Sequence, residues 1–398
     1  MILGGREMAR TMAPIFNIPD GWRIVVLGLI WRLWQALSGI LLYRLLPQIH
    51  RMIPGGLAPP LSAGWETRIW SNWDGLWYFS IAKVGYLGRP QATAFFPAYP
   101  ILLKWLGGSL SAGLAISWLS FVVGLGVLFK LSEAYFDRQT AWYAVLAAAT
   151  LPTAFFYGAL YSESLFFAAA TTSLYFVHRR HYLWAAVIIG FATAVSVYGS
   201  LLVLSLVIAL WRDRSHPFKS RMALLLIAPW GIGLYMAFLL LHFGHPLMFM
   251  RVQYLWGRHR AWPWHTLSRA LKVAWRGRAT WSHAHMWMPT SHAAGLSING
   301  WNLLFYGFAV LLLLSFGTRL PLEWLAYAAV SLMIPLFAPS RSEPLMSFPR
   351  LFLSNIPLYP ALGLMLAHSR PIRWLYWTLA LPVGLWMLAR FVSFLWVA

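Results

Sequence analysis

The sequence predicts an all-α polytopic membrane protein, and two features of its composition support this prediction. Hydrophobic residues make up 60% of the 398 residues, and charged residues only 10%. A soluble domain has about 25% charged residues, so most of this chain cannot face water. Apolar runs near the ~20 residues that cross a bilayer also recur along the chain. A transmembrane barrel is excluded because its strands would alternate apolar and polar residues.

The chain is strongly basic, with a formal net charge of +21 from 31 Lys and Arg against 10 Asp and Glu. The basic residues separate the apolar runs and do not gather on a soluble surface. This pattern favours membrane topology and contact with membrane lipids, and no nucleic-acid partner is expected. The absence of cysteine excludes disulfides and thiolate chemistry.

The positive-inside rule gives the expected topology, because cytoplasmic loops are enriched in Lys and Arg. Arg6 and Arg10 place the N-terminus in the cytoplasm, and about eleven transmembrane helices follow. Three of these lie between Ser164 and Arg212, with a turn near Tyr198. The others are expected near residues 24–46, 111–131, 141–157, 222–243, 299–316, 322–338, 351–367 and 374–396.

The whole chain, 1–398, is expected to be one transmembrane domain with two long external segments, 47–96 and 245–297. In the first segment, every fourth residue is apolar, which predicts an amphipathic helix in the membrane interface with Asp74 on the adjacent face. The residues of this repeat are Trp65, Ile69, Trp73, Trp77 and Ile81.

The scarcity of acids narrows the search for reactive groups. Of the ten carboxylates, four fall on the external side, and Asp74 and Glu163 lie nearest apolar segments. An ionisable group at membrane depth is costly, so both are candidates for function. Glu163 can also be a helix N-terminal carboxylate with Ser162 or Ser164 as the cap. Glu343 is interpreted as a solvated loop acid.

Cations can complement these acids. Arg350 begins a helix, where a positive charge opposes the helix dipole, so it requires an anionic partner or must snorkel to the interface. The second external segment contains seven basic residues and no acid, which indicates either headgroup contact or a funnel for an anionic lipid phosphate. These residues are Arg251, Arg258, Arg260, Arg269, Lys272, Arg276 and Arg278. Its histidines, among them His283, His285 and His292, follow no metal-binding spacing, so no metal and no cofactor are expected.

Four motifs resemble the signature of the PIG-V-type mannosyltransferases, a GPI mannosyltransferase 2-like family of the GT-C glycosyltransferases. They are Trp73-Asp74-Gly75-Leu76-Trp77-Tyr78, Phe95-Phe96-Pro97-Ala98-Tyr99-Pro100, Tyr161-Ser162-Glu163-Ser164-Leu165-Phe166 and Phe348-Pro349-Arg350 followed by Pro357. One departure is Ser196-Val197-Tyr198-Gly199, where family members often have an arginine before the glycine.

The resemblance implies a GT-C-like fold, a polyprenyl-phosphate donor of a sugar, usually mannose, and a glycolipid or glycan acceptor. It carries the role of catalytic base to Asp74. The donor- and substrate-binding residues that it suggests are Trp73, Gly75, Trp77, Tyr78, Tyr99, Glu163 and Arg350. The active site would face outward from a plasma (inner) membrane, or the lumen of the endoplasmic reticulum in a eukaryote.

The expected chemistry agrees with general principles. A carboxylate can accept the proton of an attacking sugar hydroxyl, and a fixed cation can stabilise a departing lipid phosphate. A single displacement predicts inversion at the anomeric carbon. Two alternatives are a transporter of lipids or lipid-linked sugars, although no internal repeat is visible, and a ligase-type enzyme that uses Arg and His without a carboxylate.

Overall fold

The computed structural model describes residues 19–47, 57, 64–86, 88–213, 215, 217–277 and 298–397. Within these ranges the regular structure is helical, and an isolated β-bridge joins Arg258 to Ser340. Several residues of the sequence analysis lie outside the described ranges. These are Arg6, Arg10, Arg278, His283, His285 and His292.

Several helices are long and apolar enough to cross a bilayer, which confirms a multi-pass membrane protein. Four are single spans: Asp20–Leu45 (α1), Leu110–Tyr135 (α5), Ile298–Arg319 (α15, Ile298–Phe316, with η6, Gly317–Arg319) and Arg370–Val392 (α19). Two more are bent pairs: Phe218–Ile227 (α10) with Trp230–Phe243 (α11), and Phe348–Ser354 (α17, Phe348–Leu351, with η7, Phe352–Ser354) with Leu358–His368 (α18).

The remaining apolar helices of the bundle are shorter than a full span. They are Arg138–Thr150 (α6), Glu163–His178 (α7), Tyr182–Val195 (α8), Gly199–Arg212 (α9) and Leu322–Phe337 (α16). The expected turn near Tyr198 is present between α8 and α9. The count of about eleven spans therefore stays a prediction. The expected helices 222–243 and 351–367 are each broken into two pieces, bent by 49° and 93°, and the expected helix 141–157 ends at Thr150.

Local signals in the sequence explain where several helices begin or bend. The side chains of Ser109, Asp137 and Ser369 each accept a hydrogen bond from a backbone N–H of the following helix, as N-cap residues do. The pair α10 and α11 bends by 49° at a break that contains Pro229. Proline removes a backbone donor, so it favours a break there.

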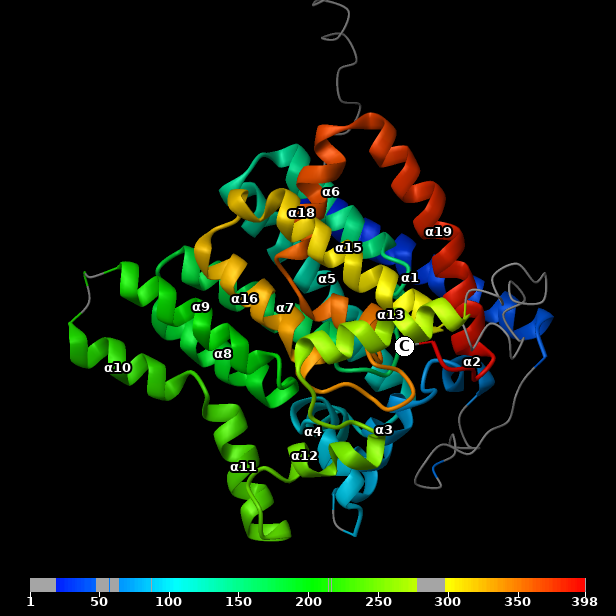
Figure 1. Ribbon diagram of the computed structural model, residues 1–398, viewed down its shortest axis with the longest axis horizontal. Coiled ribbons are helices and arrows are strands. Elements are labelled where there is room, and N and C mark those ends of the chain that lie inside the picture. The colour runs from blue at the N-terminus through cyan, green and yellow to red at the C-terminus, as the bar shows by residue number, and fades with distance from the viewer. Residues whose placement is uncertain are drawn as a thin grey trace, which may run out of the picture.

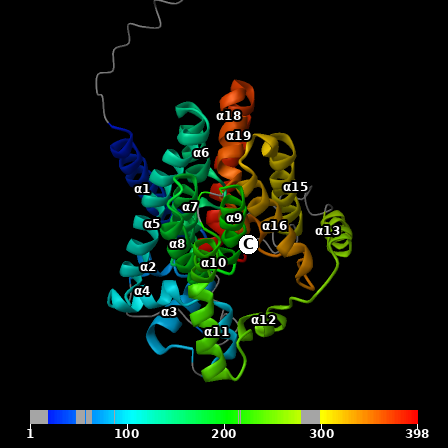
Figure 2. The ribbon, with the colours of Figure 1, turned by 90° about the vertical axis from the view of Figure 1, so that its left-hand side faces the viewer.

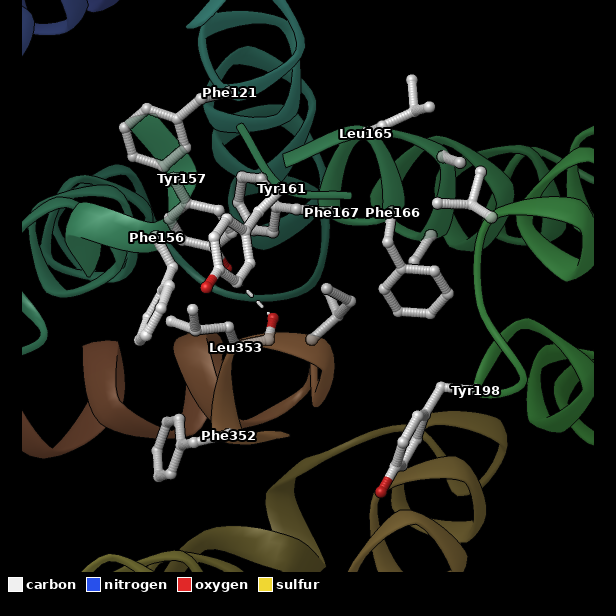
Figure 3. Close-up of a cluster of buried hydrophobic side chains, with 14 of the residues drawn as sticks. Phe121, Phe156, Tyr157, Tyr161, Leu165, Phe166, Phe167, Tyr198, Phe352 and Leu353 are labelled. Atoms are coloured by element: carbon white, nitrogen blue, oxygen red, sulfur yellow. Dashed lines mark hydrogen bonds between the residues drawn. The ribbon is translucent and has the colours of Figure 1, made fainter. Parts of the chain in front are cut away.

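The centre of the bundle is an aromatic core in which α5 packs along α7, and α6 packs along α18 (Figures 1 and 2). Figure 3 shows part of this core, where Phe121 stacks on Tyr157 with ring centroids 4.7 Å apart. The Tyr157 hydroxyl donates to the carbonyl of Leu353 at 3.0 Å. This contact ties the 154–158 turn (η2, Ala154–Gly158) to the segment that follows Arg350.

The 47–96 segment differs from the continuous helix that its periodicity predicts. A short helix, Trp65–Arg68 (α2), ends well before Asp74, and a second helix, Asp74–Val84 (α3), begins at that residue. Between them Trp73 has φ 57°, a left-handed conformation that no α-helix contains. The prediction of one interfacial helix was wrong, because tertiary contacts of Trp73 override the fourfold repeat. The segment continues through Pro90–Ala94 (η1) and Ala98–Trp105 (α4).

The 245–297 segment contains a helix with three distinct faces. After Met248–Arg251 (α12) and Val252–Trp256 (η3), the helix Pro263–Gly277 (α13) buries Thr266 and Ala270 against the protein. Trp264, Leu271 and Trp275 share an exposed apolar face, and Arg269, Lys272 and Arg276 lie on the face beside it. Exposed aromatic and basic faces side by side are typical of a helix at a membrane interface.

We predict that Gly363→Ala destabilises the protein. A Cβ at Gly363 in α18 would lie 2.6 Å from the carbonyl oxygen of Thr140 and 2.9 Å from the backbone nitrogen of Ala144 in α6. Separating two backbones costs about 1–3 kcal/mol, so the unfolding midpoint in detergent should fall by several degrees.

The matched control is Gly307→Ala in α15, where a Cβ meets nothing within 4 Å. Because alanine favours helix more than glycine, this variant should melt at or above the wild-type temperature. Equal melting of the two variants would contradict the close approach of α6 and α18.

Candidate active site

Two carboxylates from distant parts of the chain share one guanidinium group. Arg350 Nη1 lies 2.5 Å from Oδ2 of Asp74, and Arg350 Nε lies 3.2 Å from Oε1 of Glu163. The three side chains are only 12–17% exposed. The guanidinium also lies over the ring of Tyr161, 5.6 Å from its centroid. The anionic partner that the sequence requires for Arg350 is therefore present, twice.

The turn before Asp74 is held in place by hydrogen bonds on both sides. Trp73 Nε1 donates to the carbonyl of Leu395 at 3.2 Å, and Asn72 Nδ2 donates to the carbonyl of Phe391 at 2.8 Å. The Tyr161 hydroxyl donates to the carbonyl of Asn72 and accepts the backbone N–H of Asp74. A bulky residue in a left-handed conformation costs about 1–3 kcal/mol, and such strain tends to occur at functional sites.

The turn that carries Arg350 resembles the turn that carries Asp74. Ser347, which precedes α17, has φ 66°, so this segment also starts at a left-handed residue that is not glycine. The Thr153 hydroxyl donates to the carbonyl of Pro349 at 2.8 Å, which fixes the backbone just before Arg350. Both ionic partners thus project from sharp turns supported by distant elements.

Glu163 is the first residue of α7, and neither neighbouring serine caps it. Ser162 Oγ lies 2.7 Å from the Tyr78 hydroxyl, and Ser164 Oγ donates to the carbonyl of Tyr157. The capping interpretation was wrong, because both hydroxyls are used to join α7 to other segments. Oε2 of Glu163 is buried and has no hydrogen-bond partner among the described residues, which leaves an acceptor beside Arg350.

A cavity of about 290 Å³ opens beside Asp74 and Arg350. Its walls combine five aromatic rings with hydrogen-bonding side chains. The lining residues are Trp73, Asp74, Trp77, Ala94, Phe95, Gln253, Trp256, Arg258, Glu343, Met346, Ser347, Arg350 and Trp396. A pocket with mainly aromatic walls and a few placed polar groups is typical of a small-molecule site.

Arg258 belongs to the basic segment but differs from its neighbours. Its Nη1 donates to the carbonyl of Ala338 at 3.0 Å, and burial lowers its pKa. Arg251, Arg260 and Arg269 are exposed by contrast. Arg258 therefore lines the cavity and anchors the loop between α16 and α17. The number of basic residues in the 245–297 segment could not distinguish this role from contact with lipid headgroups.

Glu343 also lines this cavity, which corrects its interpretation as a solvated acid. Its Oε2 accepts a hydrogen bond from Trp396 Nε1 at 3.1 Å. Burial raises the pKa of Glu343, while the Trp396 contact opposes that shift. The sequence contains no local signal for this placement, because Trp396 reaches Glu343 only through the tertiary fold.

Some residues suggested by the family resemblance are not among those that line the cavity. Gly75 packs against the backbone just before α7, where a Cβ on this residue would lie 3.2 Å from the carbonyl oxygen of Leu160. Tyr78 contacts Ser162, and the buried Tyr99 donates to the carbonyl of Gly113 at 2.9 Å. These residues pack behind Asp74, whereas Trp73 and Trp77 face the cavity.

The fold and this site define a class: a multi-pass helical membrane protein with a buried acid–arginine–acid centre beside an aromatic cavity. Within that class, the chain is 33% identical to the protein named GPI mannosyltransferase 2 of Drosophila pseudoobscura pseudoobscura over 118 residues. It is 30% identical to GPI mannosyltransferase 2 of Drosophila melanogaster over 111 residues. The similarity to the PIG-V-type, GPI mannosyltransferase 2-like family expected from the motifs is thus confirmed.

The matched stretch is limited in length. It covers 26% of this chain and 26% of the first relative, and 24% of both chains for the second. The chain thus spans about a quarter of the curated relatives it matches. No protein-family model matches the sequence.

Comparison with solved structures gives two crystal structures of the Archaeoglobus fulgidus oligosaccharyltransferase. The complex with Zn and sulfate has a TM-score of 0.39 at 13% identity, covering 92% of this chain and 53% of that one. The form tethered with an acceptor peptide has a TM-score of 0.37 at 12% identity, covering 92% and 55%.

We predict that Arg350→Met destabilises the protein by about 3–5 kcal/mol, because it leaves two buried carboxylates without a cation. Adding Asp74→Asn and Glu163→Gln should recover most of the loss, since the buried charges are then removed together. Thermal unfolding in detergent measures both effects.

The control is Arg341→Met, which removes an exposed arginine of the same loop and should change stability little. If Arg350→Met and Arg341→Met melt alike, the ionic centre does not stabilise the fold as its geometry indicates.

Proposed function

We propose that this protein is an inverting membrane glycosyltransferase that moves a sugar, expected to be mannose, from a polyprenyl-phosphate donor to a glycolipid or glycan acceptor. The observation that carries the proposal is the pairing of Asp74 with Arg350 on the wall of one cavity, within motifs that resemble the family. The names of the two relatives support a mannosyltransferase activity.

Asp74 would act as the general base. A sugar hydroxyl is a weak nucleophile, and a positioned carboxylate that accepts its proton contributes about 10²–10⁴-fold to the rate. The acceptor oxygen bonds to the anomeric carbon as the bond from that carbon to the phosphate oxygen breaks. The electron pair leaves with the lipid phosphate, and the proton passes to Asp74, so one displacement inverts the anomeric configuration.

Arg350 would stabilise the departing phosphate. Its guanidinium has five N–H donors, and two of them are engaged by Asp74 and Glu163. A phosphate in the cavity would compete for the guanidinium, since bidentate arginine–phosphate pairs are strong. This competition would loosen the Asp74 carboxylate when the donor is bound. Arg258, on the same wall, would add positive charge nearby.

The aromatic walls and polar side chains would hold the sugar. A sugar ring has an apolar C–H face that packs on aromatic rings and hydroxyls that need hydrogen-bond partners. Trp77 and Trp256 supply rings, and Gln253 and Glu343 supply polar atoms to the same cavity. Buried polar groups that pair with substrate hydroxyls discriminate strongly between substrates.

We further propose the GT-C-like arrangement with about eleven spans and an active site on the external, periplasmic or lumenal, side. Shorter helices would then complete spans together with the turns that follow them, as α6 would with η2. An external site favours a lipid-linked donor, because nucleotide sugars are cytosolic.

The test is sugar transfer by the purified protein in proteoliposomes, with polyprenyl-phosphate-mannose and a glycolipid acceptor. Asp74→Asn should lower kcat by about 10²–10⁴-fold and leave donor binding intact, because it removes the base and keeps the shape. The matched control is Asp137→Asn, since asparagine also caps a helix well at that position.

The outcomes separate the candidate functions. Full transfer by Asp74→Asn would indicate a ligase-type mechanism without a carboxylate. Movement of the lipid-linked sugar across the bilayer with no transfer by the wild type would indicate a transporter.

We also predict that Glu343→Gln raises KM about tenfold with a smaller effect on kcat. A hydrogen bond to a charged acceptor is worth about 1.5 kcal/mol or more, which corresponds to about tenfold in affinity. Glu66→Gln, at an exposed acid of α2, is the control and should leave KM unchanged. A change in kcat alone would place Glu343 outside the sugar-binding wall.

A further inference from the structure

A second cavity, of about 620 Å³, lies at the other end of the bundle from Asp74. Helix α7 connects the two places: its first residue, Glu163, contacts Arg350, and its last residue, His178, lines the second cavity. At 1.5 Å per residue, the fifteen steps between them span about 22 Å. The cavity is therefore separate from the candidate active site. It lies where the ends of α5, α7, α9 and α16 meet.

Two acidic side chains in this cavity already form ion pairs or hydrogen bonds with other side chains of the protein. Glu323, with a side chain 10% exposed, pairs with Arg212 Nη1 at 3.4 Å and accepts the Tyr135 hydroxyl at 3.3 Å. Asp213 accepts the Tyr182 hydroxyl at 2.8 Å, and hydrogen bonds from Ser215 and Tyr182 hold its pKa at about 2. Both carboxylates are thus engaged by side chains of the protein and act as fixed supports for the basic residues.

The arginines, in contrast, keep donors for a ligand. The distance from Arg180 Nη1 to Asp213 Oδ2 is 3.8 Å, which is longer than a hydrogen bond. The side chains of Arg180 and Arg212 are 74% and 58% exposed. Arg319 lines the same cavity and packs over the ring of Phe316. Among the described residues, no carboxylate forms an ion pair with Arg319. Three guanidinium groups thus face two carboxylates in this cavity, which leaves an excess of positive charge.

We propose that this cavity binds a phosphate group. Guanidinium groups match phosphate oxygens in geometry and charge, and a basic pocket between transmembrane helices is a common site for anionic headgroups. The positive-inside rule explains basic residues at this end of the helices, but it does not explain why three of them converge on a cavity with two internally paired acids. The phosphate belongs either to an anionic lipid headgroup or to a soluble phosphate ion.

The experiment compares two probes on the full-length protein. In the first arm, native mass spectrometry counts retained phosphatidylglycerol, with phosphatidylcholine as the uncharged competitor. In the second arm, the thermal midpoint in detergent is followed as inorganic phosphate replaces chloride at constant ionic strength. The central variant is Arg319→Gln, because it breaks no ion pair of the described structure and should fold normally.

We expect Arg319→Gln to weaken binding of one probe about tenfold, and Arg319→Lys to recover part of the loss. The matched control is Arg260→Gln, an exposed arginine of the 245–297 segment, which should bind as the wild type does. A loss confined to phosphatidylglycerol identifies a lipid headgroup, and a loss confined to inorganic phosphate identifies a soluble ligand. Binding of neither probe, or equal binding by Arg319→Gln and wild type, overturns the proposal.

Discussion

The structure depends on one guanidinium group shared by two carboxylates. Removing three charges from water is expensive, and the attraction within such a centre rarely repays that cost in stability. Arg350, Asp74 and Glu163 nevertheless meet in a part of the molecule where aromatic rings surround them. Well-packed apolar residues of the same volume often stabilise a fold as well, so stability alone does not account for these three charges.

The position of this centre explains the arrangement of the elements around it. The turns that carry Asp74 and Arg350 begin at left-handed residues, and neither turn is stable through local contacts alone. Tyr161 and Thr153 hold them through hydrogen bonds from the segments that flank η2. The rigid helices α5, α6 and α7 in turn hold those segments, so the bundle acts as a frame for a small number of strained turns.

Much of this could be predicted from the sequence, and the exceptions have physical causes. Apolar runs located the long helices because burial in a bilayer requires continuous hydrophobicity. The scarcity of acids pointed to Asp74 and Glu163, and the helix dipole argument required a partner for Arg350. The break at Trp73 was missed because a fourfold repeat contains no information about contacts with Leu395. The positions of Glu343 and Arg258 on the cavity wall were not foreseen, because their burial depends on loops that pack only in the finished fold.

Those contacts with the final described segment have a consequence for biosynthesis. Asn72 and Trp73 are bonded to Phe391 and Leu395, residues more than 300 positions later in the chain. A ribosome therefore completes the segment around Asp74 long before its supporting partners emerge. Until α19 has joined the bundle, the turn before Asp74 lacks two of the hydrogen bonds that hold it, so the carboxylate reaches its final orientation late in biosynthesis.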